Sequence, residues 1–368
     1  MTSSHSFNRR LAAYRNAKGI KQDDLSRAMG FSDRQSLSAI ETGQRSLSAD
    51  ELMKALNFLQ VTFDEFSDQY SLIGEASYSW RKKDATSADI TSFEKVTNRI
   101  IALYRELHNE YATTRRSVIL PKLPLNRNSN VFDAQECAEK LVAEFNLGDF
   151  PAETLEEKLF DCFGVVTFYV DAPTTVSGAA IKLDALSVIL INRSEAVGRR
   201  NFDIAHEAFH CLTWDALPPS HEVIAERSGV KKAIEEKLAD AFASALLMPA
   251  SSIEKYFPSH TTVNEDVINS LADKFGVTSK ALLWRLLNLN KISSSLRDQL
   301  DNNLIVNNGN KNKVCTPFRL NKSYALYIQK ALQNGVISVR KMASTLGMPI
   351  ESLAELLKQY NLPIPFDL

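Results

Sequence analysis

Two histidines and a glutamate in the segment NFDIAHEAFH, Asn201 to His210, have the types and spacing of a metal-hydrolase centre. His206 and His210 are four residues apart, so on a helix both imidazoles point to one side, where they can hold one zinc ion. Glu207 directly follows His206 and can take a proton from water at the open coordination position. Two solvated or internally bonded histidines are the alternative. The apolar neighbours argue against it, because buried imidazoles and a buried carboxylate are costly without a metal or partners.

A catalytic zinc needs a third protein ligand, and the segment from Ile234 to Pro249 offers one. Glu236 and Asp240 share one face of the predicted helix. Glu236 as a ligand, with Asp240 bonded to a ligating histidine, is a sensible arrangement. A glutamate at a helix start is also typical of a solvated carboxylate that favours the helix dipole, so spacing alone leaves both interpretations open. Candidate donors to a developing oxyanion are His221, Tyr256, Arg199 and Arg200.

Helices and a small sheet are expected to position these residues. Residues 133–163 predict two helical pieces divided by Gly148 and Pro151, and helical patterns dominate residues 203–290. The strand over 187–192 either pairs with an extended substrate segment, as a sheet edge does, or lies in the sheet interior. Three short apolar runs predict strands over 165–170, 179–183 and 187–191.

The N-terminal segment has the charge and pattern of a DNA-binding module. Its first 49 residues hold eight Lys or Arg and four Asp or Glu, which is a net charge of +4 in a chain whose total is -1. Five short helices fit residues 7–67, with a sharp turn at Gly30 and a third helix capped by Ser32 or Asp33. The alternative is a helical packing unit that binds no DNA. The residues predicted to contact bases or phosphates are Gln22, Arg34, Gln35, Ser36, Ser38 and Arg45.

The segments that follow these two modules predict structure but little about function. Residues 70–88 are predicted to be a connector, and a long helix follows whose apolar stripe runs from Phe93 to Tyr111. The stripe is either a packing face or a homodimer seam, and fewer than three heptads favour packing. Residues 293–313 are predicted to be a polar linker. The helical tail beyond it predicts a small bundle, with a second helix-turn-helix-like unit, dimerisation or sensing as open roles.

Composition limits the class of protein. A chain of 368 residues with 44% apolar and 24% charged residues is typical of a globular protein with two or three domains. We expect a cytoplasmic protein with no membrane contact, because no apolar run is long enough to span a bilayer and the first residues lack a signal-peptide core. Four widely spaced cysteines fit a reducing compartment. A free thiolate from Cys137 or Cys315 is a candidate to fill the open zinc position and inhibit the site, whereas Cys211 is expected to pack.

Two stretches resemble known families. The segment from Lys21 to Leu52, with its Gln-x-x-Leu-x-x-Ala-x-Gly opening and Ile-Glu-x-Gly ending, resembles the Xre/Cro-type helix-turn-helix family. AHEAFH followed by ExxADAFASALLMP resembles the ImmA/IrrE family of zinc metallopeptidases, as do SGAA, VILIN and RRNF upstream. This resemblance implies a zincin-like, gluzincin-type site in which His206, His210 and Glu236 bind Zn²⁺ and Glu207 is the general base. It further implies that the peptidase cuts a partner helix-turn-helix repressor and releases genes for stress response, mobile elements or phage defence.

The sequence therefore predicts an α+β, mostly helical chain. It comprises an N-terminal helix-turn-helix bundle (1–68), a connector and long helix (69–120), a zincin-like metallopeptidase domain with a small β-sheet (121–295), and a linker with a C-terminal helical region (296–368). The predicted function is a DNA-binding zinc endopeptidase that regulates transcription by cleaving a repressor after a stress or DNA-damage signal. The alternative is a transcription factor of metabolic or stress genes whose HExxH domain senses a ligand.

Overall fold

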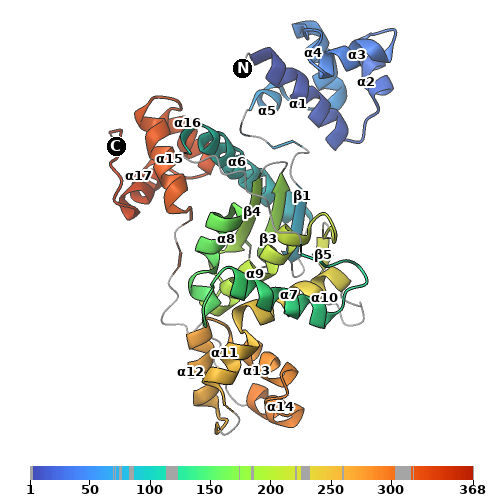
Figure 1. The fold of residues 1–368 in the computed structure, drawn as a ribbon. Coiled ribbons are helices and arrows are strands. Elements are labelled where there is room, and N and C mark those ends of the chain that lie inside the picture. Colours follow the sequence, from blue (N-terminus) through green and yellow to red (C-terminus); the bar gives the residue numbers. More distant parts are fainter. Residues whose placement is uncertain are drawn as a thin grey trace. The chain divides into compact units, whose positions relative to one another are not determined.

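The chain divides into two units of contacting residues (Figure 1). One comprises Met1–Ser77, Thr91–Ala112 and Tyr327–Leu368, and the other comprises Tyr78–Ile90 and Thr113–Leu326. The architecture is mostly helical with one small sheet, as the sequence predicts. This computed structural model describes residues 3–68, 70, 72–73, 77–82, 87–112, 123–173, 175–183, 186–219, 222–224, 233–258, 261–302, 316–317 and 319–367.

Five N-terminal helices fold around a small apolar core. Gly30 ends the second helix in the left-handed conformation at φ 90°, and Asp33 caps the third by accepting from the Ser36 N–H, so the predicted turn and cap are confirmed. Leu25 and Leu37 from these two helices are fully buried. The helices are α1 (Ser3–Ala17), α2 (Gln22–Met29), α3 (Arg34–Glu41), α4 (Ala49–Leu59) and α5 (Phe63–Ser67).

The long helix α6 spans Ser87–Tyr111, and its part from Thr91 onward belongs to this same unit. So do the C-terminal helices from Tyr327 onward. Tyr104 of α6 is fully buried and stacks on His108, and both rings contact Tyr327 of α15. The centre of the apolar stripe on α6 is therefore buried within the chain. The C-terminal helices are α15 (Lys322–Gln333), α16 (Val339–Leu346) and α17 (Ile350–Gln359).

The second unit is built on a five-stranded sheet in the order β2-β4-β3-β1-β5. β2 (Val165–Val170) runs parallel to β4 (Leu186–Asn192), and β3 (Val176–Leu183) runs antiparallel to β4. These are the three strands that the sequence predicts. β4 lies between β2 and β3, so it is an interior strand and offers no edge to a substrate.

The sequence does not predict the other two strands. β1 (Ser77–Lys82) lies in the stretch predicted to be a connector, and the three-residue β5 (Glu222–Ile224) lies in a stretch predicted to be helical. β1 pairs in parallel with β5 and is also the neighbour of β3. Such short strands form because an existing sheet edge supplies their hydrogen-bond partners, which local sequence does not reveal.

Helices α8 (Leu155–Phe163) and α9 (Val197–Thr213) pack on this sheet, with α10 (Ile234–Leu247) and α7 (Val131–Glu144) beyond them. α9 lies against β3 and β4, and α10 packs on α9 and α7. Strand residues such as Ile189 share one apolar core with Ala208 of α9 and Phe242 of α10. The two helices that carry the HExxH motif and the candidate third ligand are thus held in direct contact.

Four further helices complete this unit: α11 (Ala250–Tyr256), α12 (Glu265–Phe275), α13 (Ser279–Asn288) and α14 (Ser294–Asn302). At Gly198 of α9, a Cβ atom would lie 2.4 Å from the carbonyl carbon of Val277, so only glycine permits this close approach between α9 and the α12–α13 turn. The prediction of a linker from residue 293 is wrong over α14. Leu296 and Leu300, one turn apart, pack on the core and stabilise a helix there.

Within the described part of the chain, none of the helices combines the length and apolarity needed to cross a membrane.

Candidate metal centre

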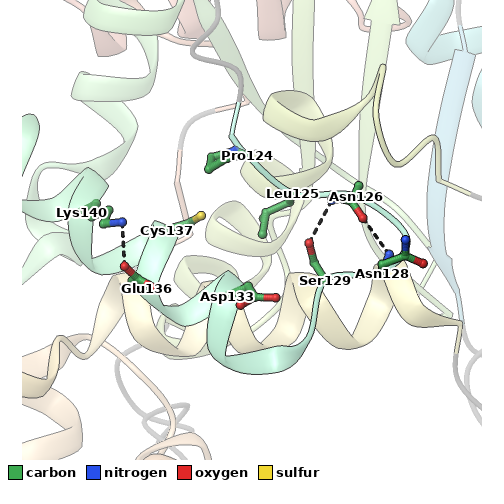
Figure 2. A pocket seen from close by; sticks show the side chains of 9 residues that line it. All are labelled: Pro124, Leu125, Asn126, Asn128, Ser129, Asp133, Glu136, Cys137 and Lys140. Atoms are coloured by element: carbon green, nitrogen blue, oxygen red, sulfur yellow. Dashed lines mark hydrogen bonds and ion pairs between the residues drawn. The ribbon is translucent and has the colours of Figure 1, made fainter.

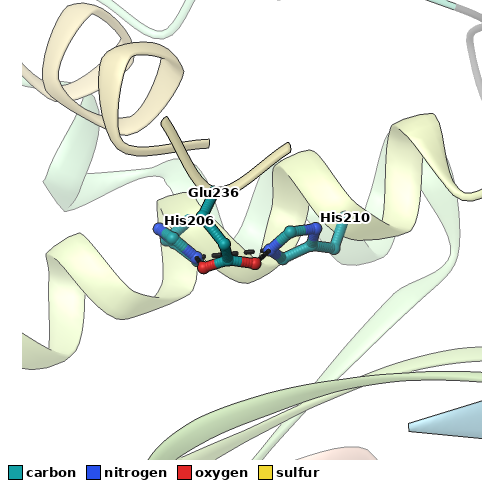
Figure 3. Close-up of side chains that lie close together, drawn as sticks. All are labelled: His206, His210 and Glu236. Carbon is teal, nitrogen blue, oxygen red and sulfur yellow. Dashed lines mark hydrogen bonds and ion pairs between the residues drawn. The ribbon is translucent and has the colours of Figure 1, made fainter. Parts of the chain in front are cut away.

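Helices α9 and α10 bring His206, His210 and Glu236 together (Figure 3). The two Nε2 atoms lie 3.2 Å apart. Glu236 directs one carboxylate oxygen at each ring, with Oε2 at 3.3 Å from His206 Nε2 and Oε1 at 3.2 Å from His210 Nε2. All three side chains are buried. The three residues that resemblance assigns as zinc ligands therefore converge on one point.

The spacing of these atoms fits a tetrahedral zinc site. Zinc bonds to nitrogen and oxygen are about 2.0–2.1 Å long, and a tetrahedron of that size has edges of about 3.3–3.4 Å. The distances of 3.2 and 3.3 Å between the donor atoms match those edges. Two imidazoles and a carboxylate are also the donor set of a catalytic site that keeps a fourth position open.

The contacts of His206 are compatible with a metal ion at this point. Its Nδ1 lies 2.9 Å from Oδ1 of Asp240, and a carboxylate only accepts, so Nδ1 carries the proton in this contact. The Nε2 atom of a neutral His206 then presents a lone pair toward an oxygen of Glu236. Such a contact between two acceptors requires either a metal ion or a proton between them. Asp240 thus lies where it orients a ligating histidine.

The pKa of the Glu236 carboxyl is lowered from its ordinary value. Burial raises this pKa, but hydrogen bonds from His206 and His210, and the positive charges that these rings carry when protonated, outweigh burial. The helix that carries Glu236 is itself fixed at its far end. The fully buried Arg285 of α13 donates to the Met248 carbonyl just after α10 and to Glu139 of α7, at 2.9 and 2.7 Å.

Glu207 lies on α9 beside the candidate ligands and is buried. Among the described residues, the group whose atoms could share one metal ion comprises His206, His210 and Glu236, and Glu207 is not part of it. Its side chain lies against β3: a Cβ atom at Gly178 would be 3.6 Å from Glu207 Cγ. The sequence did not single out Gly178 for this contact. A glycine inside a strand is a general signal of a close approach, and here the closest group is the Leu190 carbonyl oxygen, 3.0 Å from that Cβ position, with Glu207 at ordinary van der Waals distance.

Three of the four candidate oxyanion donors make other contacts. The Tyr256 hydroxyl donates to Asp149 at 3.0 Å, Arg199 pairs with Asp203 one turn along α9, and Arg200 donates to the carbonyls of Arg193 and Glu195. The Tyr256 and Arg200 contacts connect separate segments of the domain. His221 lies outside the described residues.

The cysteines occupy different places. Cys137 lines a surface pocket between α7 and the loop before it, together with Leu125 and Lys140 (Figure 2). Burial raises the pKa of its thiol, which disfavours the thiolate that would be needed to bind zinc. Burial likewise raises the pKa of Cys211, which packs in the core as predicted. Cys315 lies outside the described residues.

Four of the six residues predicted to contact DNA lie on α3. Arg34 and Gln35 are exposed, and Ser36 and Ser38 are half-buried. The other two predicted residues make internal bonds. Gln22 donates to Glu41 at 2.6 Å, a carboxylate that also holds Arg15.

Arg45 pairs with Glu51 at 2.5 Å and lies 4.9 Å from the Phe31 ring centroid. Its guanidinium remains partly exposed beside the N-terminus of α4. Arg34 and Gln35 are therefore the two predicted residues whose side chains are most accessible to a base edge.

Comparison with known families finds a match in each of two parts of the chain. Residues 160–287 match the model of the IrrE N-terminal-like domain, a peptidase family, and residues 11–66 match a helix-turn-helix model. The first range contains His206, Glu207, His210, Glu236 and Asp240, and the second contains α2 and α3. No curated protein matches the chain.

Proposed function

We propose that this chain, in which an Xre-type helix-turn-helix domain is fused to an ImmA/IrrE-type metallopeptidase domain, is a DNA-binding zinc endopeptidase that regulates transcription by cleaving a partner repressor. The observation that supports catalysis is the convergence of His206, His210 and Glu236 on one point, with Glu207 buried beside them on the same helix. A purely structural helix pair has no need for three buried, converging donors, because burying them costs free energy.

Each side chain has a separate part in the proposed hydrolysis. His206, His210 and Glu236 would hold the metal, and Asp240 would fix the ring of His206 through its Nδ1–H. Zinc, when bound, supplies a Lewis acid that polarises a carbonyl and acidifies water. Glu207 accepts the proton of the attacking water and passes it to the leaving amine. Because Glu207 is buried, the dielectric around it is low, and its electrostatic interaction with the metal site is stronger than it would be in water.

The substrate class follows from the fusion. A helix-turn-helix domain on the same chain would bring the peptidase to DNA, where repressors of similar architecture are bound. We expect activation by a stress or DNA-damage signal in the cytoplasm. The free thiols of Cys137, Cys162 and Cys211 are consistent with a reducing compartment.

The test is incubation of the purified chain with the helix-turn-helix repressor encoded beside its gene, with and without zinc and single-stranded DNA. Mass spectrometry of the products should show zinc-dependent fragments that the Glu207→Gln variant does not produce. Intact repressor under every condition, together with a metabolite that shifts DNA binding, would instead support a transcription factor whose HExxH domain senses a ligand.

A further inference from the structure

Helix α13 contacts both of the helices that carry the candidate ligands. The turn before it lies on α9, where Gly198 leaves room for the backbone of Val277. In the same turn, the Gly276 carbonyl accepts from the Asn201 side chain at 2.8 Å. The C-terminal half of α13 reaches the end of α10 through the side chain of Arg285. One short helix and its turn therefore have a defined contact with each of the two helices.

The side chain of Arg285 joins three helices and is 1% exposed. Its Nε donates to the Met248 carbonyl, just after α10, at 2.9 Å, and its Nη2 donates to Glu139 Oε1 of α7 at 2.7 Å. The same Glu139 oxygen accepts from the backbone N–H of Ala250 at 3.2 Å. Burying a guanidinium costs free energy unless it is paired, and here its bonds hold the segment in which α10 ends.

The face of α10 that carries Glu236 is continued by alanines. Helical periodicity places Ala239 and Ala243 on this face, three and seven residues further on, and both are fully buried. Rows of side chains fix how one helix lies in the grooves of another, and alanines form only shallow rows. Directional contacts at the ends of α10 therefore have a large influence on how this helix slides or rotates against α9.

A small rotation of α10 is enough to disturb the ligand set. The side chains of a helix reach about 5–6 Å from its axis, so a rotation of about 10° displaces the Glu236 carboxylate by about 1 Å. Metal sites tolerate deviations of only about 0.2 Å in their ligand distances. We propose that Arg285 is a positioning residue of the metal centre, because it fixes the end of α10 and thereby the direction in which Glu236 faces the two histidines. This inference rests on the proposed function, in which these three side chains hold the metal.

The test measures the zinc affinity of the full-length chain by competition with a zinc-binding dye. Arg285→Met keeps an unbranched side chain but removes its donors, and we expect it to bind zinc about tenfold more weakly. Arg285→Lys keeps a charged donor and should bind zinc within about threefold of wild type. Leu282→Ala is the matched control, because it opens a cavity beside the same helix without removing a hydrogen bond, and its affinity should stay within about twofold. An unchanged affinity in Arg285→Met, or an equal loss in Leu282→Ala, would overturn the proposal.

Cobalt provides a second measurement, which reports the geometry of the site. Co²⁺ bound in place of zinc absorbs visible light in bands that depend on its coordination geometry. We expect altered bands in Arg285→Met and the wild-type bands in Leu282→Ala, and identical bands in both variants would contradict the proposal.

A third variant keeps the test decisive if Arg285→Met does not fold. Glu139 is partly exposed, and Glu139→Gln should weaken zinc binding about threefold, because a neutral acceptor bonds roughly half as strongly to Arg285. An unchanged zinc affinity in this variant would overturn the proposal. Neither readout needs catalysis, so a chain that cuts nothing but depends on Arg285 for zinc binding would refute only the proposed function.

Discussion

Replacing Asp240 tests whether the buried cluster is a metal site with an oriented ligand. Asp240 accepts from His206 Nδ1 at 2.9 Å, and this bond holds the tautomer whose Nε2 faces Glu236 and His210. Without the carboxylate, the His206 ring can rotate or move its proton to Nε2, and either change opposes metal binding.

The size of the effect follows from the environment of Asp240. Loss of a carboxylate that accepts from a ligating histidine weakens metal affinity by about 10–100-fold. The Asp240 side chain is 35% exposed, so solvent screening places the effect at the lower end. Asp240→Ala should therefore weaken zinc binding about tenfold, or about 1.4 kcal/mol. Asp240→Asn should lose about threefold, because a neutral acceptor bonds roughly half as strongly.

Competition against a zinc-binding dye measures both affinities at one pH. Asp273→Ala is the matched control, since it removes an exposed carboxylate from α12. His206→Ala should abolish zinc binding, so this variant gives the lower limit of zinc affinity in the assay. Affinity unchanged within twofold in Asp240→Ala would show that the hydrogen bond does not orient a ligand. Complete loss of zinc would show that Asp240 binds the metal itself.

Three further changes test other parts of the molecule. Glu207→Gln should retain about one zinc per chain by elemental analysis and lower the cleavage rate at least about 100-fold, whereas retained cleavage would exclude this base. Arg34→Ala combined with Gln35→Ala should weaken DNA binding about tenfold or more in a mobility-shift titration, and an unchanged affinity would place base readout elsewhere. Burial raises the pKa of Glu156, despite a bond of 2.6 Å from the Tyr169 hydroxyl. Because a raised folded-state pKa costs stability as pH rises above the ordinary value of 4.5, Glu156→Gln should have a higher melting temperature than wild type at pH 7.5. The gap should close as pH falls toward 4.5, and a pH-independent gap would contradict the assignment.

Much of the candidate site was predictable because its chemistry lies within two helices. The i, i+4 spacing of His206 and His210 fixes their common direction, and the same spacing places Asp240 one turn beyond Glu236. Whether Glu236 faces the two histidines or the solvent could be learned only from the structure, since it depends on how α10 packs against α9. Spacing within one helix carries no information about the rotation of that helix toward another.

The less predictable features are those in which the partner is distant in the sequence. Glu207 packs against β3 at Gly178, 29 residues earlier in the chain, and the strand that begins at Ser77 forms where β3 offers an edge. Both contacts concern the same strand, and neither partner can be read from the residues around it. Local sequence thus specifies the groups that could act, while contacts between distant segments specify the strands and side chains that surround them.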